Sequence, residues 1–384
     1  MNKIFKFLLL ISFNCLIFST NVYTEEEKIK IGLLVPLSGE NKYLGEQIIK
    51  ATRLALKDIN NDKIEIYPKD TKSNPRQALR SAIELKQTGI KLTIGPIFYK
   101  STIYLDEVKD ITFLSLTNRT LNLPENIISS GVNSTSQLNT IKKFIELNEI
   151  KKAIFLTPDF DYDLEIKQGI KKSKIKIFKK HIYSTDPTKL TKQIEKITNY
   201  EIRKQNLIDE IKRVELSNDN NKEILLERLK KKYTLGKVNF EAIIIADFEE
   251  SLKSVITSLL YSDVSPKKKF FITFNQWFDK SLTKENASQP IYYPSINKKN
   301  FKDFKNKFFN EFNQNPNHLS LLSYDLVGLI YYLSLKTDLS NINKSFKKKN
   351  TFKGKIGIFE IENNKINHKL NFYKVDEGLI KEIF

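Results

Sequence analysis

The sequence predicts an α/β fold made of two similar lobes, each built on a parallel sheet. Three observations support this class. Short β-branched runs alternate with longer amphipathic stretches, which is the order typical of parallel strands joined by crossover helices. This alternation occurs in two series along the 384 residues. A segment near the C-terminal end then alternates apolar and polar residues, which predicts an antiparallel hairpin of a different kind.

The first series begins with a continuous apolar run at 29–35, as expected of a strand that is covered on both faces. A helix follows, and its apolar positions recur at spacings of three and four, which gives it one buried stripe. These positions are Leu44, Ile48, Ala51, Ala55 and Ile59. The series continues with predicted strands at 63–67, 92–94 and 112–116 and predicted helices at 75–88 and 101–108.

The second series begins with a helix at 135–147. It continues with predicted strands at 151–156, 174–183, 240–248 and 268–274 and predicted helices at 162–171, 249–260, 301–312 and 320–336. A charged segment at 190–233, split by "SNDNN" at 217–221, interrupts the alternation and predicts an inserted helical hairpin. This insert is either a solvated arm or a docking arm for a protein partner. The final hairpin turns around Glu362, Asn363 and Asn364.

The N-terminal segment has the features of a secretory signal. Lys3 and Lys6 precede an apolar run at 7–18, which is shorter than the roughly 20 residues a membrane helix needs. We expect cleavage after Thr24, and therefore an exported, soluble, periplasmic protein. Cys15 is the only cysteine and lies within this segment. A lipid anchor at Cys15 is the disfavoured alternative, because Asn14 stands where a small residue is expected.

The positive charge alone does not point to nucleic acid. The formal net charge is +19, and removal of Lys3 and Lys6 would leave +17 (19 − 2). Only seven of the 64 basic residues are arginines, the residue that binds phosphates and bases through two parallel hydrogen bonds. The lysines are spread along the chain, so we interpret them as solvated surface. A polyanion binder driven by charge remains a weaker alternative.

Features of catalysis are scarce in the sequence. His181, His318 and His368 lie fifty or more residues apart, without carboxylates or cysteines at metal-ligand spacing. The sequence contains neither a glycine-rich phosphate loop nor a nucleophile elbow. "PDFDYD" at 158–163 lacks the glycine and the final glutamate of a calcium loop. We therefore expect no enzyme activity, no metal and no cofactor.

Four stretches of the sequence resemble the type I periplasmic binding fold, in particular its leucine/isoleucine/valine-binding branch. They are "IKIGLLVPLSGENKYLGEQIIKATRLALKDIN", "IGPI", "FLSLTN" and "FLTPDFDYDLEIKQGI". This resemblance implies two Rossmann-like lobes joined by three crossovers, with a ligand in the cleft between them. The expected divisions are a signal peptide at 1–24, a first lobe at 25–132 plus 275–345, and a second lobe at 133–274 plus 346–384 that carries the helical insert 190–233.

The second half resembles the penicillin-binding protein activators, a narrower group with the same fold. The matching stretches are "LLERLKKKYTLGKVNFEAIIIADF", "QWFD", "NPNHLSLLSYDLVGLIYYL" and "FKGKIGIFEIENNKINHKL". This resemblance implies a non-catalytic regulator whose partner is a peptidoglycan synthase. The alternative is the substrate-binding protein of an ABC importer for branched-chain amino acids or amides, with an ABC permease and a small amino-acid-like solute as partners.

In the first lobe, the resemblance implies ligand contacts from the loops that follow three strands. The loop after the first strand offers Ser38, Gly39 and Tyr43. The next loop, "GPIFYKST", places Tyr99 where solute-binding relatives have a small hydroxyl residue, and Ser101 follows it. Thr117 matches the threonine of the family's "TN" pair.

The remaining predicted contacts are Tyr162 and Asp247 of the expected second lobe, and Asn275 and Trp277 at the start of the range 275–345. Tyr162 aligns with an aromatic residue that often closes over the ligand in the family. The other three follow the carboxyl ends of predicted strands, where open parallel sheets bind their ligands. Trp277 is alternatively a core or interface anchor, and Thr117 a turn residue.

Overall fold

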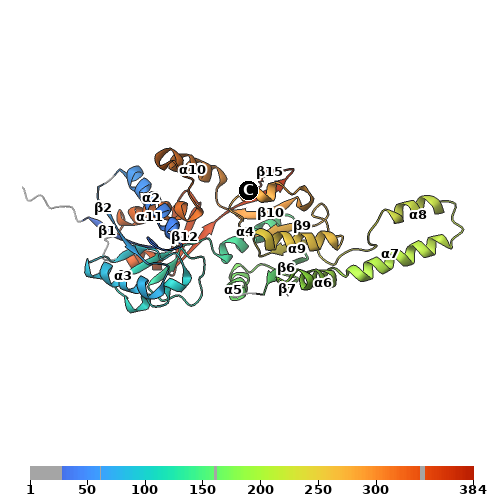
Figure 1. Cartoon of the computed structure of the whole chain (residues 1–384), viewed down its shortest axis with the longest axis horizontal. Coiled ribbons are helices and arrows are strands. Elements are labelled where there is room, and N and C mark those ends of the chain that lie inside the picture. Colours follow the sequence, from blue (N-terminus) through green and yellow to red (C-terminus); the bar gives the residue numbers. More distant parts are fainter. Residues whose placement is uncertain (1–27, 61, 160–161, 338–341) are drawn as a thin grey trace, which may run out of the picture.

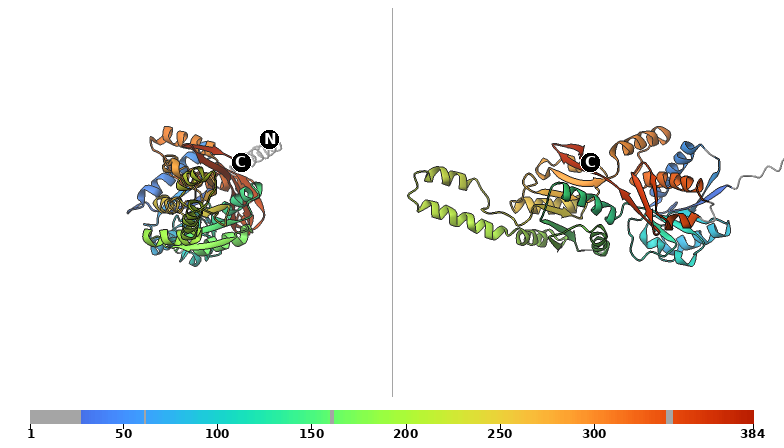
Figure 2. Two further views of the ribbon diagram at one scale, coloured as in Figure 1. Left: turned by 90° about the vertical axis from the view of Figure 1, so that its right-hand side faces the viewer. Right: turned by 180° about the vertical axis from the view of Figure 1, so that it is seen from behind.

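Two lobes lie side by side along the longest axis of the molecule, and a helical hairpin extends from the far end of the second lobe (Figures 1 and 2). The structure is a computed structural model, and it describes residues 28–60, 62–159, 162–337 and 342–384. The predicted signal peptide 1–24, with Cys15, lies outside the described residues. Within those residues, no helix combines the length and apolar character needed to cross a membrane.

The first lobe is built on a parallel five-stranded sheet of order β2-β1-β3-β4-β5. Its strands are β1 (Ile29–Val35), β2 (Ile64–Asp70), β3 (Leu92–Ile94), β4 (Thr112–Ser115) and β5 (Ile127–Ser129). Helices α2 (Lys42–Ile59) and α11 (His318–Ser334) pack on one face of this sheet, and α3 (Pro75–Gln87) packs on the other. The sheet is therefore covered on both faces, as the apolar run of β1 predicts.

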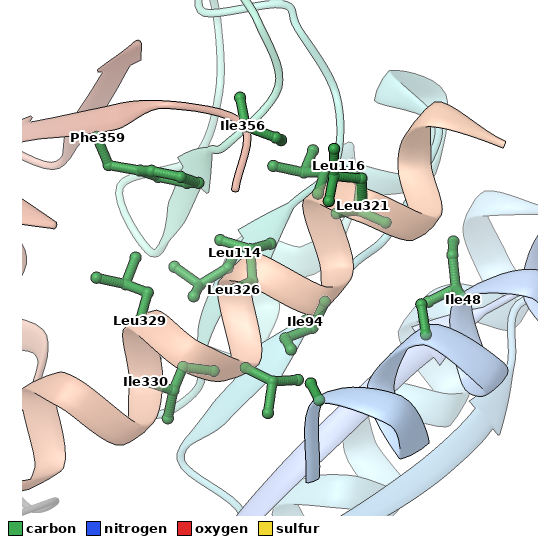
Figure 3. Close-up of a cluster of buried hydrophobic side chains, with 14 of the residues drawn as sticks. Ile48, Ile94, Leu114, Leu116, Leu321, Leu326, Leu329, Ile330, Ile356 and Phe359 are labelled. Carbon is green, nitrogen blue, oxygen red and sulfur yellow. The ribbon is translucent and has the colours of Figure 1, made fainter. Parts of the chain in front are cut away.

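Helix α11 lies in the middle of the first lobe's core. Its Leu326 and Ile330 belong to the same buried cluster as Ile94 and Leu114 of the sheet (Figure 3). On its other side, the cluster continues to Phe359. A helix that is apolar around most of its circumference is expected where it is enclosed on several sides.

The second lobe is built on a seven-stranded sheet of order β15-β14-β10-β9-β8-β6-β7. Its strands are β6 (Ala153–Pro158), β7 (Lys179–Tyr183), β8 (Ala242–Ile245), β9 (Phe270–Thr273), β10 (Ile291–Ser295), β14 (Asn371–Asp376) and β15 (Leu379–Glu382). The sheet is parallel except for β14 and β15. Helices α4 (Ser134–Leu147) and α5 (Asp163–Ser173) cover one face, and α6 (Pro187–Thr198) and α9 (Glu249–Tyr261) the other.

A small antiparallel sheet near the C-terminal end completes the first lobe. It consists of β11 (Asn350–Lys353), β12 (Ile358–Glu362) and β13 (Lys365–Lys369). The predicted hairpin turn at Asn363 and Asn364 is confirmed, and both residues have positive φ angles, 51° and 56°. Helices α10 (Lys298–Phe312) and α12 (Ile342–Lys347) precede this sheet.

The inserted hairpin consists of α7 (Tyr200–Glu215) and α8 (Lys222–Lys230), which pack on each other through Leu207, Val214 and Leu229. It is shorter than the predicted 190–233. Leu190 and Ile194 lie in α6 and are buried in the second lobe's core, so α6 belongs to the lobe and not to the hairpin.

Other short elements also differ from expectation. The helix predicted at 101–108 is two 3₁₀ helices, η1 (Tyr99–Thr102) and η2 (Leu105–Glu107). Strands β5 and β10 have no counterpart among the predicted elements. Between β9 and β10 lie two further 3₁₀ turns, η3 (Lys280–Thr283) and η4 (Asn286–Ser288).

The chain passes between the two lobes three times, the number implied by the resemblance. The passages follow β5, β10 and β13. Sheet membership differs from the expected lobe ranges in two places. Strand β10 lies within 275–345 but pairs with β9 and β14 in the second lobe. Residues 350–369 were expected in the second lobe, yet their apolar side chains pack into the first lobe's core.

Candidate functional site

The loops at the carboxyl ends of the two parallel sheets meet between the lobes. The loop after β4 contacts α5, which follows β6 of the second lobe. Ligands of open parallel sheets bind at such ends. This interlobe region is therefore the candidate site.

In the loop after β1, the polar groups are engaged by Asp70 at the end of β2. The hydroxyl of Ser38 donates to Asp70 Oδ2 at 2.6 Å, and the main-chain N–H groups of Leu37 and Lys72 donate to Oδ1 at 2.8 Å. Burial alone would raise the pKa of Asp70, but these hydrogen bonds outweigh burial and the pKa is lowered. The hydroxyl of Ser38, a predicted ligand contact, thus already binds a carboxylate of the protein.

The other two predicted residues of this segment are Gly39 and Tyr43. Gly39 has a φ of 77°, a left-handed conformation that favours glycine. Tyr43 is 60% exposed at the start of α2. A glycine that sequence reasoning missed, Gly45, lets α2 pack closely on this loop, because an added Cβ would lie 1.8 Å from the carbonyl oxygen of Pro36.

In the loop after β3, Ser101 is fully buried and its hydroxyl has no hydrogen-bond partner within the described residues. Tyr99 is half-buried, and the guanidinium of Arg119 lies 5.0 Å from the centre of its ring. The same guanidinium lies 6.0 Å from the ring of Tyr162, on the other lobe. Arg119 therefore lies between two predicted site aromatics, at distances typical of cation–π contacts.

Thr117 lies in the loop after β4, where its hydroxyl oxygen accepts a hydrogen bond from the N–H of Arg119 at 3.2 Å. This bond, between a hydroxyl and an N–H two residues further on, is the turn-forming alternative for Thr117. Its carbonyl accepts from Ser129 Oγ at 2.7 Å and from the N–H of Gly131. The loop is thereby fastened to the segment where the chain leaves the first lobe.

Glu165, a residue that sequence reasoning missed, joins the lobes directly. Its side chain is 3% exposed, in the first turn of α5. It accepts hydrogen bonds from the N–H of Thr120 at 2.7 Å, the hydroxyl of Thr120 at 2.9 Å and the N–H of Leu121 at 2.8 Å. These are charge-assisted bonds, which are stronger than neutral ones. The signal available in the sequence was an acidic residue three positions after Tyr162, the predicted aromatic.

On the second lobe, Asp247 follows β8 and its carboxylate is surrounded by donors from the protein. It accepts from the hydroxyls of Tyr183 and Ser251 and from the N–H of Phe248 at 2.8 Å. Burial raises the pKa of Tyr183, and the neighbouring Asp247 adds to this effect. Asp247 is thus placed where predicted, but its hydrogen bonds hold its own lobe together.

Asn275 and Trp277 lie in the segment after β9. The carbonyl oxygen of Asn275 accepts from Ser295 Oγ at 2.6 Å and from the N–H of Trp277 at 3.0 Å. The amide nitrogen Nδ2 of Asn275 is buried and has no partner among the described residues. The ring of Trp277 stacks on His318 of α11, with ring centres 4.5 Å apart, and packs against the first lobe's core.

The structure thus brings Tyr99 and Tyr162 together around Arg119, while the other predicted residues are distributed over separate loops of the two lobes. Among the described residues, no group of three histidine, cysteine, aspartate or glutamate side chains gathers as a metal site would require. The polar and charged groups of this region are mostly hydrogen-bonded to other groups of the protein.

Comparisons with known proteins agree with the two-lobe architecture. A family profile described as "Periplasmic binding protein" matches residues 28–197. No curated protein matches the chain. Three solved structures are similar over nearly all of this chain and of their own length, each with low sequence identity.

The branched-chain amino acid transporter substrate-binding protein LivJ from Streptococcus pneumoniae, in complex with isoleucine, is 18% identical, with a TM-score of 0.54 over 92% of this chain and 98% of its own. The C-domain of LpoA from Haemophilus influenzae, a regulator of PBP1A, is 15% identical, with a TM-score of 0.62 over 92% of this chain and 100% of its own. A putative branched-chain amino acid ABC transporter protein from Rhodospirillum rubrum is 13% identical, with a TM-score of 0.68 over 93% and 100%. The chain thus has the two-lobe fold of type I periplasmic binding proteins.

Proposed function

We propose that this chain is an exported, non-catalytic protein that regulates a peptidoglycan synthase by binding to it, as the resemblance to the penicillin-binding protein activators implies. The main support is that hydrogen-bond donors in the interlobe region already bind carboxylates of the chain itself. Donors in the loops after β1 and β4 are occupied by the chain's own carboxylates, Asp70 and Glu165. The LpoA C-domain, described as a regulator of PBP1A, has the same fold and supports this direction.

Occupied donors disfavour a small solute on energetic grounds. A solute carboxylate would have to displace Asp70 from Ser38, or Glu165 from Thr120 and Leu121. A hydrogen bond to a charged group contributes about 1.5–3 kcal/mol, and a displaced buried carboxylate also loses its compensation. Binding a solute there would therefore start from a substantial deficit.

The helical hairpin offers a surface for protein contact (Figure 1). Its base is fixed by Arg203, whose guanidinium donates to Thr198 O and to Thr234 Oγ1, each at 3.0 Å, and also to Ser262 O. Several large apolar side chains of the hairpin are exposed: Ile202, Ile208, Leu216, Ile224 and Tyr233. We infer that these exposed apolar side chains on a fixed element form a surface for a protein partner.

Direct binding to a purified peptidoglycan synthase of the same organism tests the proposal. We expect saturable binding in biolayer interferometry, and a loss of about tenfold or more in the double variant Leu216→Ser/Ile224→Ser. Leu147→Ser/Leu335→Ser removes two equally exposed apolar side chains away from the hairpin and should bind like the wild type. Absence of binding to the synthase, together with binding to an ABC permease, would overturn the proposal.

The alternative is a substrate-binding protein of an ABC importer for branched-chain amino acids or amides. One observation favours it: Ser101 Oγ and Asn275 Nδ2 are buried polar atoms without partners in the described part of the chain, and both were predicted as ligand contacts. Likeness to LivJ in complex with isoleucine is the second support. Buried polar groups usually have a partner, so a ligand is one explanation.

Thermal unfolding with leucine, isoleucine, valine and their amides separates the two functions. A true receptor gains about 2.7 kcal/mol when the solute is present at 100 times its Kd, which should raise the midpoint by several degrees. The same gain should be smaller in Ser101→Ala. A flat response to the whole panel would exclude this alternative and leave the regulator proposal intact.

A further inference from the structure

A groove with a volume of about 980 Å³ lies along β5. It is lined by the segment before β5, the turn between β12 and β13, the start of α4, and single residues of α5 and α12. None of the ten predicted site residues is among those that line it. Its size suits a drug-sized ligand, and we refer to it as the β5 groove.

The β5 groove carries excess positive charge. Four lysines line it, against two acidic residues, Asp106 and Glu125. The lysines are Lys109, Lys172, Lys347 and Lys365. None of the four has an ion-pair partner in the part of the chain that the structure describes. Burial lowers the pKa of Lys172, and Lys365 lowers it further, against a smaller opposite effect of Glu165.

The N-terminus of α4 reaches the same groove. Asn133 caps this helix by accepting a hydrogen bond from the N–H of Ser136 at 2.9 Å. Thr135, in the first turn, is 7% exposed, lines the groove, and has a hydroxyl without a hydrogen-bond partner among the described residues. The positive end of a helix and an unused hydroxyl both favour an anion.

Neutral donors and acceptors complete the lining. Asn363 and Asn364 form the turn between β12 and β13, which is held by main-chain bonds to the carbonyls of Lys347 and Phe346 at 3.2 and 2.9 Å. Their side-chain amides have no partner within the described residues. These amides can bind the hydroxyl or oxo groups of a ligand that the lysines attract by charge.

We propose that the β5 groove binds a small polyanion, a molecule or chain end with at least two phosphate or carboxylate groups, held by Lys172, Lys365 and the start of α4. Lys172 belongs to α5 of the second lobe, whereas Lys365 belongs to β13, which packs with the first lobe. Such a ligand would therefore contact both lobes, beside Thr120, which bonds to Glu165. This proposal does not depend on the choice between regulator and importer.

Isothermal titration calorimetry of the purified chain with inorganic triphosphate and with citrate tests the proposal. We expect saturable binding of at least one probe, weakened about tenfold or more in Lys172→Gln/Lys365→Gln, because charged hydrogen bonds are lost. Lys267→Gln/Lys268→Gln removes the same charge from exposed lysines of the second lobe and should change the affinity by about twofold or less. Affinity should fall as salt is raised.

A second variant addresses the helix terminus without removing charge. Thr135→Val keeps the shape of the side chain and should weaken the probe that binds by several-fold, because only the hydroxyl is lost. Tighter binding of triphosphate would identify a phosphate ligand, and tighter binding of citrate a carboxylate ligand. Absence of saturable binding by both probes, or an equal loss in the Lys267→Gln/Lys268→Gln control, would overturn the proposal.

Discussion

His368 lies buried at the passage between the lobes and has an incomplete set of hydrogen bonds. Its side chain is 2% exposed, its Nε2 lies 2.8 Å from the carbonyl oxygen of Ser130, and Nδ1 has no partner among the described residues. Its main-chain N–H donates to Ser136 Oγ at 2.9 Å. Burial lowers the pKa of His368 from 6.5 to about 4.

This lowered pKa predicts acid sensitivity. Below pH 6.5 the unfolded chain takes up a proton that the folded chain accepts only near pH 4, so stability falls as the pH drops through this interval. In His368→Gln, the free energy of unfolding should fall by about 2 kcal/mol less than in the wild type between pH 7 and pH 5. Urea unfolding at both pH values measures the difference. Equal pH dependence in the two proteins would contradict this assignment.

Asp325 changes the pH dependence of stability in the opposite direction to His368. The effect of His368 is therefore measured as a difference between the wild type and His368→Gln. Asp325 is buried in α11 and accepts hydrogen bonds from the N–H groups of Lys355 and Ile356 at 2.8 and 2.7 Å. Burial nevertheless raises its pKa to about 7. Its contribution to stability therefore decreases as the pH rises from 4 to 7, against that of His368. Gly354 is required beside it, since an added Cβ would lie 2.4 Å from Oδ2.

At the scale of elements, the attachment of the helical hairpin depends on Arg203. Replacement by methionine removes three hydrogen bonds at the base, to Thr198, Thr234 and Ser262, and leaves buried acceptors without a donor. Unsatisfied buried groups cost about 1–3 kcal/mol each. Arg203→Met should therefore increase hydrogen exchange throughout α7 and α8, measured by mass spectrometry, while exchange in the second lobe's sheet stays unchanged.

Arg213→Met provides the matched control for this prediction. Arg213 lies in the same helix, but it is exposed and pairs with the neighbouring Glu210, at 2.7 Å. Exposed pairs contribute about 0–1 kcal/mol, so hydrogen exchange in this variant should remain close to that of the wild type. Equal exchange of the hairpin in Arg203→Met and Arg213→Met would show that Arg203 does not fix its base.

Elements with a clear local pattern were predictable from the sequence, and several others were not. The apolar stripe of α2 and the alternation of β12 and β13 each specify their element locally. Strands β5 and β10 have no such alternation, and each forms by pairing with a neighbouring strand. The sequence of helix α6 resembles that of the charged insert, but α6 packs on α9 and therefore belongs to the second lobe.

For the candidate site, the sequence indicated the loops but not their hydrogen-bond partners. Ser38 and Asp247 follow the strands as predicted. That Asp70 meets the first loop, and Glu165 the loop after β4, depends on the positions of neighbouring strands and lobes. Such contacts between distant segments leave no periodic signal in one sequence. The sequence alone therefore could not decide whether a loop residue such as Ser38 donates to a ligand or to the protein itself.

At the scale of the whole molecule, Glu165 makes one of the contacts between the two lobes. Three donors from the loop after β4 converge on this one carboxylate of α5. Since the chain crosses between the lobes through three short passages, rotation of one lobe against the other is the expected motion of this architecture. A two-state equilibrium shifts tenfold for each 1.4 kcal/mol of differential stabilisation, which is less than one charged hydrogen bond provides.

Glu165→Gln should therefore shift the lobes toward a more separated arrangement. The glutamine oxygen can still accept from the two N–H groups, but its amide nitrogen would face the Thr120 hydroxyl, which can then no longer donate to it, and the charge that strengthens all three bonds is lost. Spin labels at Ile103 and Phe178, which are exposed on the first and second lobes, would report this shift as a longer or broader distance distribution. Asp163→Asn makes the same charge change in the same helix, where Asp163 pairs with Lys167 and Lys180 of its own lobe, and should leave the distribution unchanged. If both variants gave the wild-type distance distribution, Glu165 would not hold the lobes together, and other contacts would have to set the distance between them.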